Sequence, residues 1–97
     1  MNWTHEQRSA VWFKAQEVPG VDGNAWRKDA CGAWIGWSSY GDRNSQYGWE
    51  IDHVDPRGGD SISNLRPLQW QNNLSKSAGR LVCVVKASSQ ANVSIGR

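Results

Sequence analysis

Short apolar runs separated by polar, turn-forming segments are the main pattern of this chain. Near the start, Thr4 followed three residues later by Gln7 is a capping-box pattern, and no helix breaker occurs until the Pro-Gly pair at 19–20. This pattern predicts a helix over about residues 4–17. Residues 18–24 are rich in turn-forming side chains, which predicts an irregular connection after that helix.

Two apolar runs in the middle of the chain predict β-strands. They lie at 33–37 and 47–54, and a polar loop over residues 38–46 connects them. Pro56 ends the second strand, because proline cannot donate a ladder hydrogen bond. The glycine-bearing segment 57–61 then predicts a further loop.

The last third of the chain predicts one more helix between two extended segments. The pattern indicates a short strand or extended piece at 65–69, a helix at 70–79 and a final short strand at 81–85. Residues 87–97 are small and polar, which predicts a flexible tail. We therefore expect an α+β fold in one small domain over residues 1–97, with an N-terminal helix and a short C-terminal strand.

Composition and charge change this picture in two ways. The chain of 97 residues contains seven tryptophans, and each can bury roughly 150–250 Å² of a small core. The formal net charge is only +2, but residues 1–60 carry six basic and nine acidic side chains, whereas residues 61–97 carry five basic side chains and no acidic one. A basic final third suits a polyanionic partner, and the same charges also fit a plain solvated face.

Two cysteines, Cys31 and Cys83, lie 52 residues apart, and neither belongs to a C-x-x-C pair. One chain therefore cannot assemble a four-thiolate site, and we expect no structural zinc. The polar N-terminus shows no secretory signal, which predicts a cytoplasmic protein with two free, buried thiols; a Cys31–Cys83 disulfide is the alternative. No apolar run approaches the length of a membrane span, so we expect no membrane partner.

The residues with the clearest chemistry are an Asp-His pair and three polar side chains after it. Asp52 and His53 are adjacent at the end of the second predicted strand, and Asn64, Asn73 and Lys76 follow. Neighbouring side chains of a strand point to opposite sides, so Asp52 can hold a metal while His53 faces an attacking water. An imidazole can take a proton from water at neutral pH, which makes His53 a candidate general base.

The remaining three residues can complete a site that cleaves a phosphodiester bond. Asn73 can bring its amide oxygen to the cation held by Asp52, and carboxylate and amide oxygens are ligands that suit Mg²⁺. Lys76, one helical turn later, can reach a phosphate oxygen. Asn64 can hydrogen-bond backbone groups and fix the loop that positions His53.

The run from about residue 47 to residue 77 resembles the HNH nuclease motif, the ββα-metal fold. The resemblance is carried by Asp52-His53, by Asn64 with the Leu-Arg-Pro-Leu run after it, and by the N-x-x-K ending from Asn73 to Lys76. It implies a β-hairpin followed by a helix, His53 as general base, Asp52 and Asn73 as metal ligands, and Asn64 as the orienting residue.

The resemblance also implies a cofactor and a partner. These are one divalent cation, Mg²⁺ with Mn²⁺ or Ni²⁺ as substitutes, and DNA bound by a monomer or homodimer. Small stand-alone HNH proteins belong to bacteria, phages and mobile elements, which implies a bacterial or phage-infected cell. Two departures stand out: the loop between His53 and Asn64 is shorter than the common family form, and the chain lacks the paired cysteines with which many members bind structural zinc.

Some neighbouring residues have competing interpretations. Asn72 is the rival of Asn73, but the spacing from Asn64 favours Asn73 and leaves Asn72 facing solvent. Glu50 shares a strand face with Asp52 and could approach the metal.

Three basic residues, Arg66, Lys76 and Arg80, are candidate phosphate contacts, with a solvated role as the alternative for the two arginines. The sequence thus predicts a metal-dependent DNA endonuclease or nickase. The alternative is a nucleic-acid-binding or assembly module that keeps the fold without cutting, and a third possibility is a disulfide-bonded secreted module.

Overall fold

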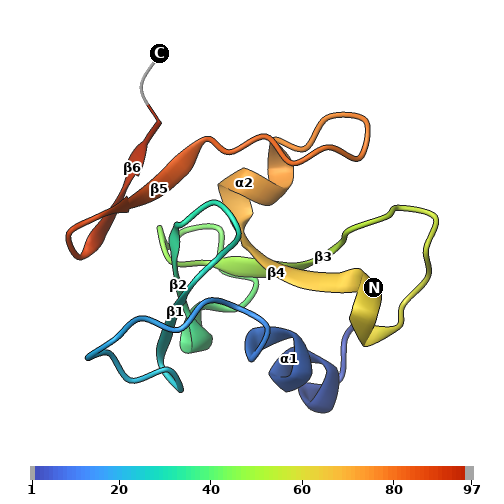
Figure 1. Ribbon diagram of the computed structural model, residues 1–97, viewed down its shortest axis with the longest axis horizontal. Helices are drawn as coiled ribbons and strands as arrows, with labels where there is room; N and C mark the ends of the chain where they lie inside the picture. Colours follow the sequence, from blue (N-terminus) through green and yellow to red (C-terminus); the bar gives the residue numbers. More distant parts are fainter. Residues whose placement is uncertain (1, 96–97) are drawn as a thin grey trace.

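The computed structural model describes residues 2–95, which fold into short helices and antiparallel strands (Figure 1). Helix α1 (His5–Trp12) begins after Thr4, whose hydroxyl accepts from the Gln7 backbone N–H while the Gln7 side chain accepts from the Thr4 N–H. This is the predicted capping box, which satisfies backbone donors that the start of a helix leaves free. Within residues 2–95, no helix is long and apolar enough to cross a membrane.

A β-hairpin followed directly by a helix occupies the middle of the molecule. Strand β3 (Trp49–His53) pairs with β4 (Leu65–Gln69) in antiparallel fashion, and α2 (Trp70–Leu74) continues from β4. Strand β4 has its predicted bounds. In Figure 1 the hairpin lies between α1 on one side and α2 on the other, and both helices contact it.

Alternation along β3 assigns its side chains to these two sides. Trp49 and Ile51 pack into the core beside α1, and His53 follows them on that side. Glu50 and Asp52 point to the other side, toward α2. The predicted divergence of Asp52 and His53 is therefore confirmed.

The end of the chain forms a second antiparallel hairpin. Strand β5 (Val85–Ser88) pairs with β6 (Ala91–Ser94), so the prediction of a flexible tail over residues 87–97 is wrong as far as residue 95, and residues 96–97 lie outside the described part. The strand expected at 81–85 is also wrong except for its last residue. Cross-strand hydrogen bonds order a segment whose small polar residues gave no sign of a strand.

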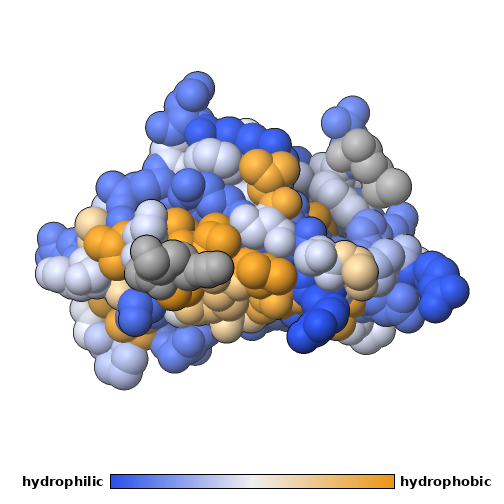
Figure 2. Space-filling model, turned by 90° about the horizontal axis from the view of Figure 1, so that it is seen from above, coloured by the Kyte–Doolittle hydropathy of each residue, from blue (hydrophilic) through white to orange (hydrophobic). Residues whose placement is uncertain are grey.

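The surface of the molecule carries both apolar and hydrophilic side chains on the face shown in Figure 2. Figure 2 shows apolar side chains gathered in a band across the face seen from above, with hydrophilic side chains around it. The large apolar side chains exposed over residues 61–95 are Ile62, Leu74, Val82 and Val93.

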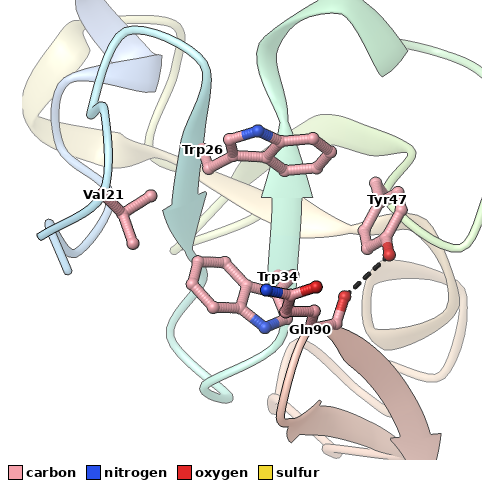
Figure 3. A pocket seen from close by; sticks show the side chains of 5 residues that line it. All are labelled: Val21, Trp26, Trp34, Tyr47 and Gln90. Atoms are coloured by element: carbon pink, nitrogen blue, oxygen red, sulfur yellow. Dashed lines mark hydrogen bonds between the residues drawn. The ribbon is translucent and has the colours of Figure 1, made fainter.

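A third hairpin carries one exposed and one half-buried tryptophan, Trp26 and Trp34. Strand β1 (Trp26–Lys28), which the sequence did not predict, pairs with β2 (Trp34–Gly36), while Arg27 and Ile35 between them are buried on the opposite face. The exposed face borders a cleft of about 340 Å³ (Figure 3). Its lining residues are Val21, Trp26, Trp34, Tyr47 and Gln90.

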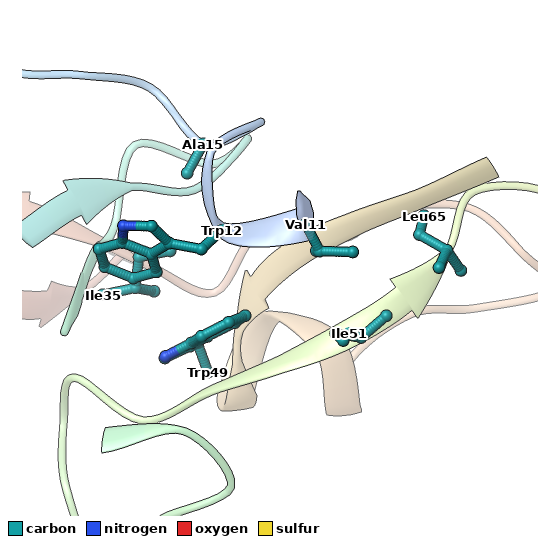
Figure 4. Packing of buried hydrophobic residues seen from close by; sticks show 7 residues of the cluster. All are labelled: Val11, Trp12, Ala15, Ile35, Trp49, Ile51 and Leu65. Carbon is teal, nitrogen blue, oxygen red and sulfur yellow. The ribbon is translucent and has the colours of Figure 1, made fainter. Parts of the chain in front are cut away.

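The core gathers where α1 meets the β3–β4 hairpin and β2 (Figure 4). Its buried members are Val11, Trp12, Ala15, Ile35, Trp49, Ile51 and Leu65. The rings of Trp12 and Trp49 lie 5.2 Å apart, and Trp37 packs against both. Tryptophan thus contributes to the core as expected, but Trp26 is 38% exposed and lies outside it.

Both helices are shorter than predicted, for different local reasons. Helix α1 stops before residue 17 because Gln16 pairs with Lys28 in an antiparallel bridge. Helix α2 stops before residue 79 because residues 77–80 close a tight turn in which Ala78 and Gly79 have positive φ values. Tertiary pairing and turn geometry override the local helix pattern in both cases.

Candidate active site

Two side chains of β3 meet two side chains of the α2 segment, which is α2 with the residues that follow it up to Lys76, on the polar side of the hairpin. The Asn73 amide donates to Glu50 Oε1 at 2.9 Å, and Lys76 Nζ donates to Asp52 Oδ1 at 2.5 Å. Glu50 and Asp52 are two apart on β3 and share a face, and Lys76 lies just past the end of α2, where its backbone N–H donates to the Asn73 carbonyl. Four of the residues that the sequence singled out, including the less favoured Glu50, therefore lie together.

Asp52 is the most enclosed of the four, with its side chain only 5% exposed. Its second oxygen, Oδ2, accepts from Arg66 Nε at 2.8 Å, and Lys76 Nζ also donates to the backbone carbonyl of His53 at 2.9 Å. A buried carboxylate needs this kind of compensation, and removing one partner of such a pair typically costs about 3–5 kcal/mol. Arg66 and Lys76, which the sequence predicted as phosphate contacts, thus hold Asp52 in this structure.

Glu50 is held by a cation and an amide. Arg43 contacts both of its oxygens, with Nε at 2.6 Å from Oε2 and Nη2 at 3.0 Å from Oε1. Burial alone would raise the pKa of Glu50, but the hydrogen bonds from Arg43 and Asn73 and the charge of Arg43 outweigh it and bring the pKa below its ordinary value. Glu50 is therefore ionised at neutral pH.

The side chains on this face that could hold a hard divalent cation are Glu50, Asp52 and Asn73. Glu50 and Asp52 offer carboxylate oxygens, and Asn73 donates through its nitrogen, which leaves its amide oxygen without a partner among the described residues. Such a set matches the oxygen ligation of Mg²⁺. A cation would compete with Lys76 and Arg66 for the oxygens of Asp52. Over residues 2–95, no three side chains of the His, Cys, Asp or Glu types form a metal-binding group.

His53 lies on the opposite side of β3 and has a carboxylate partner of its own. Its Nε2 is 2.6 Å from Asp60 Oδ1, its ring lies 5.7 Å from that of Trp3, and its side chain is 29% exposed. An ionised carboxylate only accepts, so Asp60 favours the tautomer that has its proton on Nε2 and leaves Nδ1 free to accept one. The sequence analysis missed Asp60, because nothing local shows that the loop folds back onto His53.

Asn64 fixes this loop as predicted. Its side-chain oxygen accepts from the Asp55 N–H at 2.9 Å, and its amide nitrogen donates to the carbonyls of Asp55 and Gly59 at 2.9 and 2.8 Å. A β-carbon on Gly58 would lie 2.7 Å from that amide nitrogen, so the loop needs glycine there. The Gly-Gly pair and Asn64 thus form one clamp.

The prediction that Asn72 faces solvent is wrong. Asn72 is fully buried, and its amide donates to Asp29 Oδ2 and to the Val85 carbonyl while its oxygen accepts from the N–H groups of Val84 and Val85. Buried polar groups require such partners. Asn72 therefore attaches α2 to the chain on either side of it, and this anchors Asn73.

The prediction of two free thiols is also wrong, because Cys31 and Cys83 form a disulfide. The bond joins the turn after β1 to the segment before β5, close to the Asp29–Asn72 contact. The absence of a secretory signal therefore did not predict the state of these two cysteines. The alternative that the sequence left open is the one that the structure contains.

Arg80 lies outside this set of contacts. It is exposed in the turn over residues 77–80, and it makes no ion pair within the described part of the chain. Its predicted role as a phosphate contact stays a prediction.

No protein-family model, curated protein or solved structure matches this chain. The functional assignment therefore depends on the residues and contacts described above.

Proposed function

We propose that this protein is a metal-dependent DNA endonuclease or nickase of the HNH type, which hydrolyses phosphodiester bonds. The observation that carries the proposal is the pair of contacts between β3 and the α2 segment, Asn73 to Glu50 and Lys76 to Asp52. The residues in these contacts offer oxygen ligands for a cation, and His53, which follows Asp52 in the sequence, offers an imidazole.

In this proposal, each side chain has one task. Glu50, Asp52 and Asn73 hold one divalent cation, with Mg²⁺ the first expectation. When bound, such a cation stabilises the negative charge on the leaving oxygen. His53 takes the proton from the attacking water through Nδ1, and Asp60 keeps the other ring nitrogen protonated.

The cationic side chains also change partners in this proposal. Lys76 and Arg66 neutralise Asp52 in this structure, and Lys76 would be able to reach a phosphate oxygen of the DNA if a bound cation compensated the charge of Asp52 instead. Arg80, exposed in the following turn, supplies a further phosphate contact. One site cuts one strand, so nicking is expected unless two copies act together.

The test is nicking of supercoiled plasmid in the presence of Mg²⁺, Mn²⁺ or Ni²⁺. Loss of one general base reduces the rate by about 10²–10⁴-fold, and we expect this of His53→Ala. His5→Ala is the matched control, because His5 is an exposed histidine of α1 that takes no part in the site. Plasmid left intact by the wild type with all three metals, or nicked equally by His53→Ala, would overturn the proposal.

A second function is favoured by one observation. Both oxygens of Asp52 are already satisfied by Lys76 and Arg66, as expected of a structural ion pair. This favours a nucleic-acid-binding or assembly module that does not cut. Salt-dependent DNA binding without nicking by the same preparations would support that function instead.

A further inference from the structure

The cleft beside the β1–β2 hairpin has walls of aromatic rings. Trp26 and Trp34 come from the exposed face of this hairpin, and Tyr47 meets Trp26 edge-on at 4.8 Å (Figure 3). The volume of about 340 Å³ is at the lower end of the range for small-molecule sites, which suits a single ring system.

The walls are held in place by hydrogen bonds to the turn between β5 and β6. The Tyr47 hydroxyl donates to the Gln90 carbonyl at 2.7 Å, and the Trp34 indole N–H donates to the Ser89 carbonyl at 2.7 Å. The Asn92 amide further ties this turn to the Trp34 carbonyl at 2.9 Å. The walls of the cleft therefore come from three segments that these hydrogen bonds hold together: the β1–β2 hairpin, the chain at Tyr47 and the β5–β6 hairpin.

Two polar groups at the cleft remain free to bind a ligand. Within residues 2–95, neither the indole N–H of Trp26 nor the side-chain amide of Gln90 makes a hydrogen bond. An amide offers one donor and one acceptor side by side, which matches the edge of a nucleobase.

Positive charge adjoins the aromatic cleft. Lys28 Nζ lies 4.8 Å from the ring centre of Trp34, and Lys28 also lines a second cleft of about 220 Å³ with Lys14 and Arg66. The acid of that cleft, Asp29, is buried and accepts from four N–H donors. Lys28 thus contacts a wall of the first cleft and lines the second, whose basic side chains outnumber its one acid.

We propose that these two clefts form a binding site for single-stranded nucleic acid, with one base between Trp26 and Trp34 and a neighbouring phosphate against Lys28, Lys14 and Arg66. Stacking platforms beside a basic groove are how proteins hold unpaired strands. A sugar ring or an apolar peptide would use the aromatic cleft but make no use of the positive charge of Lys28, Lys14 and Arg66 beside it. Arg66 also holds Asp52, so the strand would lead toward the candidate active site.

This inference takes its class of ligand, a nucleic acid, from the proposed function, but it does not require cleavage. It is therefore tested by measuring binding in the absence of any divalent metal. The probe is fluorescein-labelled dT10, followed by fluorescence anisotropy at low salt. Trp26→Ala should weaken binding about 5- to 150-fold, as expected for one stacked base. Phe13→Ala, which removes an aromatic side chain that is 55% exposed and lines neither cleft, should bind as the wild type does.

Two further variants separate the contributions. Gln90→Ala removes an exposed side chain and should weaken binding even if Trp26→Ala fails to fold. Lys28→Gln should reduce the salt dependence of binding by about one phosphate contact, while Lys86→Gln, an exposed lysine outside both clefts, should not.

The results distinguish this proposal from the nuclease. His53→Ala should lose nicking and still bind dT10 with the wild-type affinity. Equal binding of dT10 by the wild type, Trp26→Ala and Gln90→Ala would overturn the site and leave the nuclease proposal standing. Preference for an oligosaccharide or a proline-rich peptide over dT10 would also overturn it.

Discussion

Three asparagines with different partners organise the β3–α2 unit. Asn64 clamps the loop of the hairpin, Asn72 is buried beneath α2, and Asn73 meets Glu50. Sequence spacing identified the first and third because their partners lie within one motif. It could not identify Asn72, since that residue bonds to Asp29, which is distant in sequence.

Replacing Asn72 should destabilise the protein strongly. Asn72→Ala leaves an oxygen of Asp29 and the backbone groups of Val84 and Val85 without their buried partner, so we expect a loss of about 2–4 kcal/mol in the free energy of unfolding. Urea denaturation measures it. The control is Asn24→Ala at an exposed position, which should change stability by less than about 0.5 kcal/mol. Equal effects of the two variants would contradict the role of Asn72.

Glu50 should make stability depend on acid pH. A carboxyl whose folded-state pKa lies below its unfolded value stabilises the fold above the unfolded pKa, and that contribution is lost as the pH falls through the folded value. The stability gap between the wild type and Glu50→Gln should therefore close as the pH is lowered below about 4.5. Denaturation curves recorded from about pH 6 to pH 3 measure this gap.

The control for Glu50 is Glu17→Gln, at a carboxyl that is 76% exposed, where we expect no comparable change of the gap with pH. A gap between the wild type and Glu50→Gln that stays constant into acid would show that the contacts of Glu50 do not favour its ionised form.

At the scale of elements, the hairpin loop was predictable, but its construction was not. Glycine and proline residues predicted a loop between β3 and β4. The role of Asn64 followed from its amide side chain and its position at the end of that loop. The approach of the Asp60 side chain to His53 depends on how the closed loop folds back, which no local pattern encodes. The same holds for β1, whose register is set by its partner β2.

Gly58→Ala tests the construction of the loop. The added β-carbon would press on the Asn64 amide, which three hydrogen bonds hold in place, so we expect a loss of about 1–3 kcal/mol in the free energy of unfolding. The same substitution in an Asn64→Ala background should cost about 1 kcal/mol less, because the clash is gone. An unchanged cost in that double-mutant cycle would mean that Asn64 is not what restricts position 58.

At the scale of the whole molecule, a small core and a covalent link act together. The core lies between α1 and the β3–β4 hairpin, while the Cys31–Cys83 bond ties the opposite side, where Asn72 anchors α2. The sequence predicted the tryptophan-rich core from composition. It left the disulfide only as an alternative, since the two cysteines become neighbours only after β5 folds back to the turn between β1 and β2, where the Ala87 N–H donates to the Gly32 carbonyl.

Reduction of the disulfide should lower stability without a change of sequence. Closing a loop of this length limits the unfolded chain, so dithiothreitol should reduce the free energy of unfolding by about 2–4 kcal/mol. The Cys31→Ser/Cys83→Ser double variant is the control, and it should show no response to the reductant. Two titratable thiols in the native protein would contradict the bond.

The most direct test of the account is the position of a bound cation. Mn²⁺ added to isotope-labelled protein broadens the NMR signals of nearby amides, and we expect this broadening to centre on residues 50–53 and 73–76. Asp52→Asn and Glu50→Gln should each weaken it, while Asp42→Asn, at an exposed acidic residue, should not. Broadening centred elsewhere, or left unchanged by both substitutions, would contradict a cation site between β3 and α2.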